Sequence, residues 1–409
     1  MKCYPVSANR SVVMMSTPAT LVAADPCSAP GAKALATRIQ SIDALRGLVI
    51  LLMLVDHTRE FFFIHAQVSD PMDVGTTAPA LFFTRLAAHL CAPVFVALTG
   101  LGAWLYGSKK GGAAAASGFL FKRGLFLVLL ELTAVNFAWT FSLTPPTVFL
   151  QVIWVIGLSM IALAALVHLP RGWLIAVGVI IVLGHNLLDP INFVEGQPGH
   201  TLWAILHDRG FIDLPWGGQA RTSYPLLPWI GVAALGYAVG PWFAGEAASR
   251  RRRLLTAGAI MLGMFVVLRC VNLYGDPTPW SVQPDALRSA MSYLNLTKYP
   301  PSADFLLLTL GVGVLVLAAL ERTSVRVVRL LAVFGGAPLF FYLIHLYALH
   351  LLHLAALSLL GVNRGDTFGV PAVGWLWLVA AILAVPCWFA CRWFAGVKRN
   401  SQRAWLKYL

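Results

Sequence analysis

Two pairs of ionisable side chains lie at the ends of one apolar stretch near the start of the chain. Asp43 and Arg46 precede it, Asp56 and His57 follow it, and residues 48–55 between them carry no polar side chain. An imidazole can accept a proton near neutral pH and so act as a general base. An arginine binds phosphate or carboxylate groups through paired hydrogen bonds. The pattern therefore predicts an anion-binding end and a proton-accepting end.

Helical geometry connects these two ends. Arg46 and His57 are eleven residues apart, which is about three helical turns, so both side chains share one face about 16 Å apart. We infer that a cofactor or substrate runs between the cation and the imidazole. We expect an adjacent carboxylate, Asp56, or one from another helix, Glu131, to orient the imidazole.

The composition identifies the class of protein. Of the 409 residues, 58% are hydrophobic and 11% are charged, whereas soluble domains carry about 25% charged residues. The formal charge of +13 lies mainly in short loops between apolar runs, which indicates membrane insertion rather than nucleic-acid binding. The six cysteines form no C-x-x-C pair and no H-E-x-x-H motif is present, so neither a disulfide framework nor a metal site is expected.

Apolar runs long enough to span a membrane predict an all-α bundle of about ten transmembrane helices. Lys and Arg concentrate in alternate loops and at the end of the chain, which places both termini in the cytoplasm. Residues 1–38 are predicted to form a disordered cytoplasmic tail, 39–396 the transmembrane domain and 397–409 a basic cytoplasmic tail. The runs are 44–64, 80–106, 118–141, 147–168, 171–189, 224–244, 253–273, 303–320, 331–359 and 374–396.

Several ionisable residues fall inside these runs, where they are costly and usually face a cavity or the bundle interior. With the predicted orientation, most of them converge on the outer half of the membrane, in a cavity that opens outward. The alternative is that each has a structural role, as a packing histidine or as one member of a helix-end pair. These residues are Arg85, His89, Glu131, His185, Asp189, His345 and His350.

Six sequence blocks together resemble a known family. They cover most of the chain after Arg38 and are SIDALRGLVILLMLVDHTREFFF, DPMDVGTTAPALFFTRLAAHLCAPVFVALTG, QVIWVIGLSM, HNLLD, SYPLLPWIGVAALGYAVG and PLFFYLIHLYALHLL. The chain resembles bacterial relatives of heparan-α-glucosaminide N-acetyltransferase. This resemblance implies that an acetyl group passes from cytoplasmic acetyl-CoA to a sugar across the membrane. A weaker similarity to the acyltransferase-3 membrane enzymes implies an Arg, ten residues and then a catalytic His in the first helix, and Arg46 and His57 match that spacing.

The spacing on the first helix, the ionisable residues inside the runs and these similarities together suggest roles for the polar residues. His57 is the expected catalytic histidine, with His65 as its rival. The other expected catalytic residues are Asp56, His89 and Glu131. Asp43, Arg46 and Arg123 are expected to bind acetyl-CoA at the inner face, and Arg85, His185, Asp189, His345 and His350 to contact the acceptor.

The sequence thus predicts an integral membrane acyltransferase, placed by the resemblance in a bacterial inner membrane, with acyl-CoA, a saccharide-like acceptor and the lipid bilayer as partners. A proton-coupled transporter and a non-catalytic structural or sensory protein are the alternatives. No inverted repeats support transport, and the density of ionisable residues in the spans disfavours a purely structural protein. The acceptor, N- versus O-acylation, the acyl chain, one-step versus two-step transfer and the oligomeric state stay open.

Overall fold

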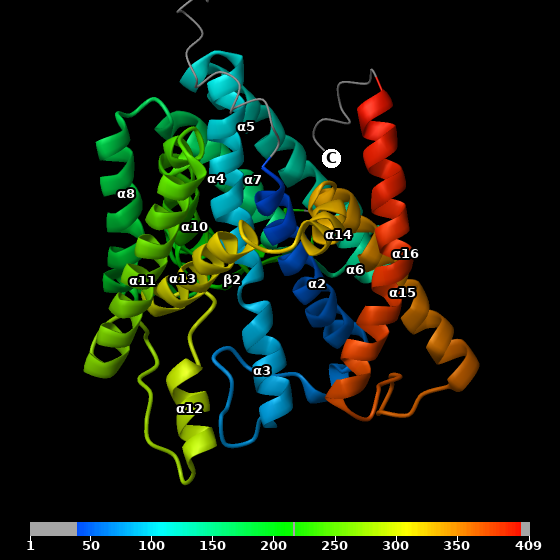
Figure 1. Cartoon of the computed structure of the whole chain (residues 1–409). Helices are drawn as coiled ribbons and strands as arrows, with labels where there is room; N and C mark the ends of the chain where they lie inside the picture. Colours follow the sequence, from blue (N-terminus) through cyan, green and yellow to red (C-terminus); the bar gives the residue numbers. More distant parts are fainter. Residues whose placement is uncertain (1–38, 216, 402–409) are drawn as a thin grey trace, which may run out of the picture. The chain divides into compact units, whose positions relative to one another are not determined.

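Helix α2 (Gln40–Phe62) lies inside a bundle of mostly apolar helices (Figure 1). The computed structural model describes residues 39–215 and 217–401, so the expected N-terminal tail and the end of the basic C-terminal tail lie outside the described residues. α2 packs against helices from both halves of the chain, among them α3 (Pro79–Ala88), α14 (Val325–Gly335) and α15 (Pro338–Leu360). The first helix of the chain is therefore a central one.

Seven helical stretches are long and apolar enough to cross a membrane, which confirms a polytopic membrane helix bundle. Helices α7 (Val152–Leu166) and α10 (Leu227–Ala238) are apolar but shorter, and α2 carries charged residues near both ends. The number of ten spans and the cytoplasmic termini therefore stay predictions. The seven stretches are Pro79–Lys110, Gly112–Thr140, Arg171–Leu188, Ala247–Val271, Ala303–Leu320, Pro338–Leu360 and Val373–Asn400.

Several of these stretches consist of more than one element. The remaining helices are α4 (Cys91–Lys110), α5 (Gly112–Leu130), α6 (Asn136–Thr140), α8 (Arg171–Gly184), α9 (His200–Leu206), α11 (Ala247–Val271), α12 (Ala286–Leu294), α13 (Ala303–Leu320) and α16 (Val373–Asn400). Short 3-10 turns are η1 (Ile64–Ala66), η3 (His185–Leu188) and η4 (Gly240–Phe243), and a π-helical turn, η2 (Glu131–Val135), joins α5 to α6.

Large apolar side chains remain exposed on the outer faces of the long helices. A soluble protein rarely exposes so many together, whereas a membrane-spanning bundle turns such residues toward lipid. Among them are Phe121, Leu125 and Leu129 of α5, Ile180 of α8, Ile260 and Val267 of α11, and Ile382, Phe389 and Trp393 of α16.

The all-α expectation misses a small sheet. Strands β1 (Thr147–Leu150), β2 (Gly210–Asp213) and β3 (Gln219–Thr222) form a sheet in the order β1-β3-β2, with β1 parallel and β2 antiparallel to β3. The run predicted as a helix over 147–168 therefore begins as a strand. Its first residues are β-branched or aromatic, and they pair with a segment 72 positions further on, which no local pattern reveals.

The helix predicted over 331–359 is two helices. α14 ends at Gly335, and α15 begins at Pro338 after a short break. A proline ring cannot continue a helix from the preceding turn because it lacks an N–H and clashes with the earlier carbonyl, but it is suited to the first helical turn. The end of α14, at Gly335, lies against the first turns of α2 just before this break.

Two glycines let α2 and α14 approach closely. A Cβ built on Gly47 would lie 1.9 Å from the Leu331 carbonyl oxygen, and one built on Gly335 would lie 1.8 Å from the Asp43 carbonyl oxygen. Neither distance allows a side chain. Backbone contact of this kind is the usual way in which membrane helices gain packing energy, because lipid provides no hydrophobic drive between helices.

We expect Gly47→Ala to destabilise the bundle by about 1–3 kcal/mol, because the added methyl group forces α2 and α14 apart. Thermal unfolding of the detergent-solubilised protein measures this. Gly263→Ala in α11 is the matched control, since a Cβ there meets no atom within 4 Å and alanine favours a helix. Equal melting temperatures for the two variants would contradict the proposed close contact.

Candidate functional site

One cavity of about 300 Å³ runs beside α2 and is lined by residues from both of its halves. Arg46 lies on its wall near one end of α2, and Asp56 and His57 lie on it three turns further along. The cavity therefore joins the two ends that the sequence pattern singles out. The rest of the wall is largely apolar and includes Met53, Cys91, Phe95, Thr99, Phe119, Leu127, Ile153, Ile156, Met160, Pro338, Leu339 and Tyr342.

Positive charge gathers at the Arg46 end. Arg46 donates to the Asp43 carboxylate over 3.1 Å and to the Leu98 carbonyl over 3.3 Å, so its guanidinium is held in place. Arg123 of α5 and Lys398 near the end of α16 line the same cavity. Asp43, which is expected to bind acetyl-CoA, positions the Arg46 side chain and does not itself line the cavity. Together the three cations form a site for an anionic group.

His57 forms a hydrogen bond with a second histidine from α15. The Nδ1 atom of His57 lies 2.7 Å from Nε2 of His345, and Nδ1 of His345 lies 2.7 Å from the Phe341 carbonyl oxygen. A carbonyl only accepts, so His345 Nδ1 carries the proton and, in the neutral ring, His345 Nε2 accepts. His57 Nδ1 must then be the donor.

This chain of hydrogen bonds fixes the tautomer of His57. Because its proton sits on Nδ1, the unprotonated nitrogen of neutral His57 is Nε2, and Nε2 has no hydrogen-bond partner within the described residues. Trp139 and Tyr342 contact the ring edge-on, with centroid distances of 5.1 and 5.8 Å, and hold its plane. The ring therefore offers a lone pair at the cavity wall, as a general base or nucleophile requires.

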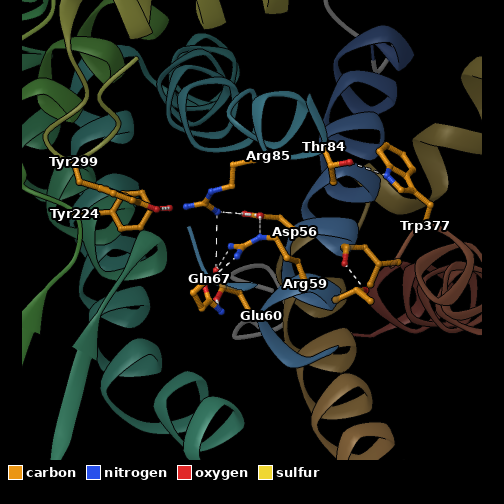
Figure 2. Close-up of polar contacts among 11 residues, drawn as sticks. Asp56, Arg59, Glu60, Gln67, Thr84, Arg85, Tyr224, Tyr299 and Trp377 are labelled. Carbon is orange, nitrogen blue, oxygen red and sulfur yellow. Dashed lines mark hydrogen bonds and ion pairs between the residues drawn. The ribbon is translucent and has the colours of Figure 1, made fainter. Parts of the chain in front are cut away.

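Asp56 belongs to a buried charge network instead of orienting His57 (Figure 2). Its carboxylate accepts from Arg85 of α3 over 3.0 and 3.1 Å and from Arg59 over 3.1 Å. Arg59 also pairs with Glu60 and donates to Gln67. Two buried guanidinium groups thus face two carboxylates, which balances the charge. Arg85 is a structural partner of Asp56 and does not line the cavity.

Lys298 and Tyr224 line the His57 end of the cavity. The Lys298 ammonium lies 5.1 and 6.0 Å from the ring centres of Tyr299 and Tyr224, whose hydroxyls are 3.1 Å apart. The Lys298 backbone N–H donates to Asp70, in the loop after α2. Burial raises the pKa of Asp70, although the nearby Lys298 and Arg85 charges act in the opposite direction. Sequence reasoning missed Lys298 and Tyr224, because both lie in loops far from α2 in sequence.

Two other residues that are expected to be catalytic, His89 and Glu131, are buried away from the cavity wall. His89 is buried against Phe305 and does not line the cavity. Glu131 is buried in the π-helical turn η2, where it accepts from the backbone N–H groups of Gln151 and Trp154. A carboxylate there satisfies free donors at the start of α7 and complements the helix dipole. Glu131 therefore caps α7 and makes no hydrogen bond to His57.

The remaining residues that are expected to contact the acceptor lie in different parts of the structure. His345 lies beside His57, whereas His350 bonds to the Ala138 carbonyl and stacks on Phe141 away from the cavity. His185 and Asp189 do not line the cavity. They cluster with His207, which follows α9.

His65 lies outside the cavity as well. It is exposed in η1, packed against Phe63, and partial burial together with the Arg364 charge lowers its pKa. Of the two rival histidines, only His57 reaches the cavity.

Comparison with known proteins adds one match. A family model described as heparan-α-glucosaminide N-acetyltransferase, catalytic, matches residues 38–269. The matched part contains Arg46, His57 and Arg123, whereas Lys298, His345 and Lys398 lie beyond it. The match is thus shorter than the six sequence blocks suggest. No curated protein matches the chain.

We expect Asp56→Asn to lower stability by about 3–5 kcal/mol, because it leaves Arg59 and Arg85 buried with too little negative charge. Glu60→Gln is the matched control. Its side chain is 34% exposed, against 13% for Asp56, so water screens the loss and the cost is about 1 kcal/mol or less. Thermal unfolding in detergent measures both, and a larger loss for Glu60→Gln would contradict this account of the network.

Proposed function

Because the chain belongs to the catalytic family of heparan-α-glucosaminide N-acetyltransferase and is therefore an acetyl-CoA-dependent membrane acetyltransferase, we propose that its cavity presents the thioester of acetyl-CoA to His57. The observation that carries this proposal is the single cavity with three basic side chains at one end and a histidine with a free ring nitrogen at the other. The acyl acceptor is an amine or hydroxyl, as in a sugar.

The basic end suits the phosphates of coenzyme A. Arg46 is already oriented by Asp43, and Arg123 and Lys398 line the same cavity and add positive charge. A cavity of about 300 Å³ is at the small end for ligand pockets. It matches the narrow pantetheine arm, with the nucleotide remaining at the mouth. The arm then follows α2 for about 16 Å to reach His57.

The His57 end supplies the chemistry. As the acceptor heteroatom bonds to the thioester carbonyl carbon, His57 Nε2 takes the proton that the acceptor loses. The C–S bond then breaks, and the leaving coenzyme A thiolate takes that proton from His57 Nε2. The same nitrogen also suits a two-step transfer through an acetylated histidine. His345 holds the ring and keeps Nε2 free in either case.

Lys298 and Tyr224 line the His57 end of the cavity, where Lys298 would contact the thioester and Tyr224 would contact the acceptor. The Lys298 ammonium stabilises the negative charge that develops on the thioester oxygen, since a buried cation acts strongly where water is excluded. Aromatic rings beside it offer flat faces on which a sugar ring packs.

The direction of transfer follows from charge. Lys109, Lys110 and the arginines at 250–253 lie at helix ends that the positive-inside rule places in the cytoplasm. The Arg46 end of the cavity then faces the cytoplasm. The acceptor reaches His57 from the opposite side, so the acetyl group crosses the membrane through the protein.

The central test separates binding from chemistry. We expect His57→Ala to bind acetyl-CoA normally but to lose acetyl transfer by about 10²–10⁴-fold, the usual contribution of a general base. Arg46→Ala should weaken acetyl-CoA binding by about tenfold or more, the loss of one charged hydrogen-bonding group. Binding by calorimetry and release of free coenzyme A measure the two effects on purified protein.

Two controls match these variants. His65→Ala changes the exposed rival histidine and should retain transfer, and Lys110→Ala removes an exposed cation and should retain binding. Full transfer by His57→Ala, or loss of transfer in His65→Ala, would overturn the assignment.

A further prediction concerns the tautomer. We expect His345→Phe to reduce kcat by about tenfold or more with little change in KM for acetyl-CoA, because His57 then lacks the acceptor that keeps its proton on Nδ1. His345→Gln, whose side-chain oxygen can accept, should restore part of the rate. His350→Phe on the same helix is the control, and an equal loss there would indicate general damage to α15.

A further inference from the structure

A second group of polar residues lies away from the cavity, where η3 meets α9. His185, Asp189 and His207 each offer one ligand atom, and these atoms all lie within 4.8 Å of one another. None of the three lines the acetyl-transfer cavity. His185 begins η3 and Asp189 follows it, directly after α8, and His207 follows α9, so the group joins two segments across the connecting loop.

The polar atoms of this group lack the partners that buried groups normally have. His185 is 2% exposed, and neither of its ring nitrogens forms a hydrogen bond in the described part of the chain. The Pro301 carbonyl is near the ring but outside hydrogen-bonding geometry. Asp189 Oδ1 is also buried without a hydrogen bond. Each such atom costs about 1–3 kcal/mol, so three together call for a ligand.

His207 has the opposite imbalance, because both of its nitrogens face oxygen atoms. Nδ1 lies 2.9 Å from Asp208 Oδ1, and Nε2 lies 3.1 Å from the His185 carbonyl and 3.4 Å from Asp189 Oδ1. A neutral imidazole has only one proton. With that proton on Nδ1 toward Asp208, Nε2 turns a lone pair toward oxygen atoms, an arrangement that a cation between them would relieve.

The surrounding residues already orient two of the three ligands, Asp189 and His207. Asn186 donates to Asp189 Oδ2 over 2.9 Å, and its own oxygen accepts from the Ala303 backbone, so Oδ1 of Asp189 is the carboxylate atom left over. Trp203 stacks on His207 at 5.0 Å. A histidine whose second nitrogen is bound by a carboxylate, as His207 is by Asp208, is the usual outer support of a metal ligand.

We propose that His185, Asp189 and His207 bind a divalent transition-metal ion, with zinc as the expected occupant. Two imidazole nitrogens and one carboxylate oxygen are ligands that zinc prefers. Ligand atoms bound tetrahedrally at about 2.1 Å lie about 3.4 Å apart, so the group needs to contract by little more than an ångström. His185 is free to turn because it has no hydrogen bond to break.

Such an ion would tie the loop after α8 to the end of α9. The chain continues from there through β2 and β3 to Tyr224, on the wall of the acetyl-transfer cavity. The ion is therefore structural: it fixes the outer segment that carries part of the cavity wall and takes no part in proton transfer.

The test is zinc binding by the full chain, purified in detergent without a polyhistidine tag and stripped with a chelator. Titration with zinc chloride should load one equivalent per chain, measured by elemental analysis after gel filtration. The melting temperature should rise by several degrees, because zinc binds the folded state. His185→Ala and Asp189→Asn should lose both effects, and Asp189→Asn keeps the size of the side chain.

Matched variants make the result decisive. His168→Ala removes an exposed histidine and should leave zinc binding intact. His57→Ala should also bind zinc while it fails to transfer acetyl groups, so the two proposals can fail separately. Absence of zinc uptake by the stripped wild type would overturn the metal site, as would unchanged affinity in both His185→Ala and Asp189→Asn.

Discussion

Buried ion pairs hold the C-terminal end of α2 in position. Arg59 and Arg85 are almost completely excluded from water, and each would be very costly without a carboxylate. Asp56 bridges them, and this bridge fixes α3 against α2 (Figure 2). Because Asp56 precedes His57 in the chain, the same network sets the position of the histidine that we propose to be catalytic. The proposed acetyl-transfer site is thus anchored by buried ion pairs.

A second constraint comes from close backbone contact. Gly47 and Gly335 bring α2 against α14, and the break after Gly335 starts α15 at the proper place for His345 to meet His57. Membrane helices gain stability from such contacts because the lipid offers no competing hydrophobic drive. The hydrogen bond from His57 to His345 therefore depends on two glycines, one in α2 and one in α14, that meet near the other end of α2.

Polar residues in this bundle divide into three groups with different functions. One group, at the two ends of the cavity, is proposed to bind acetyl-CoA and to move a proton. A second group, with Asp56, Arg85 and Glu131, satisfies buried charges and the free end of α7. The third group, around His185, has unsatisfied polar atoms, and supporting hydrogen bonds orient Asp189 and His207. The cost of an ionisable group in a membrane protein does not by itself distinguish these functions.

The sequence alone determined what is local. Apolar runs identified a polytopic membrane protein, and helical periodicity put Arg46 and His57 on one face of α2, where the structure has both on one cavity wall. The tertiary structure decided what depends on distant segments. His345 is 288 residues from His57, Lys298 comes from a loop, and Glu131 caps α7 instead of approaching His57. The physical reason is that spacing along one helix follows from a fixed rise per residue, whereas partners across helices depend on crossing angles and breaks that only packing sets.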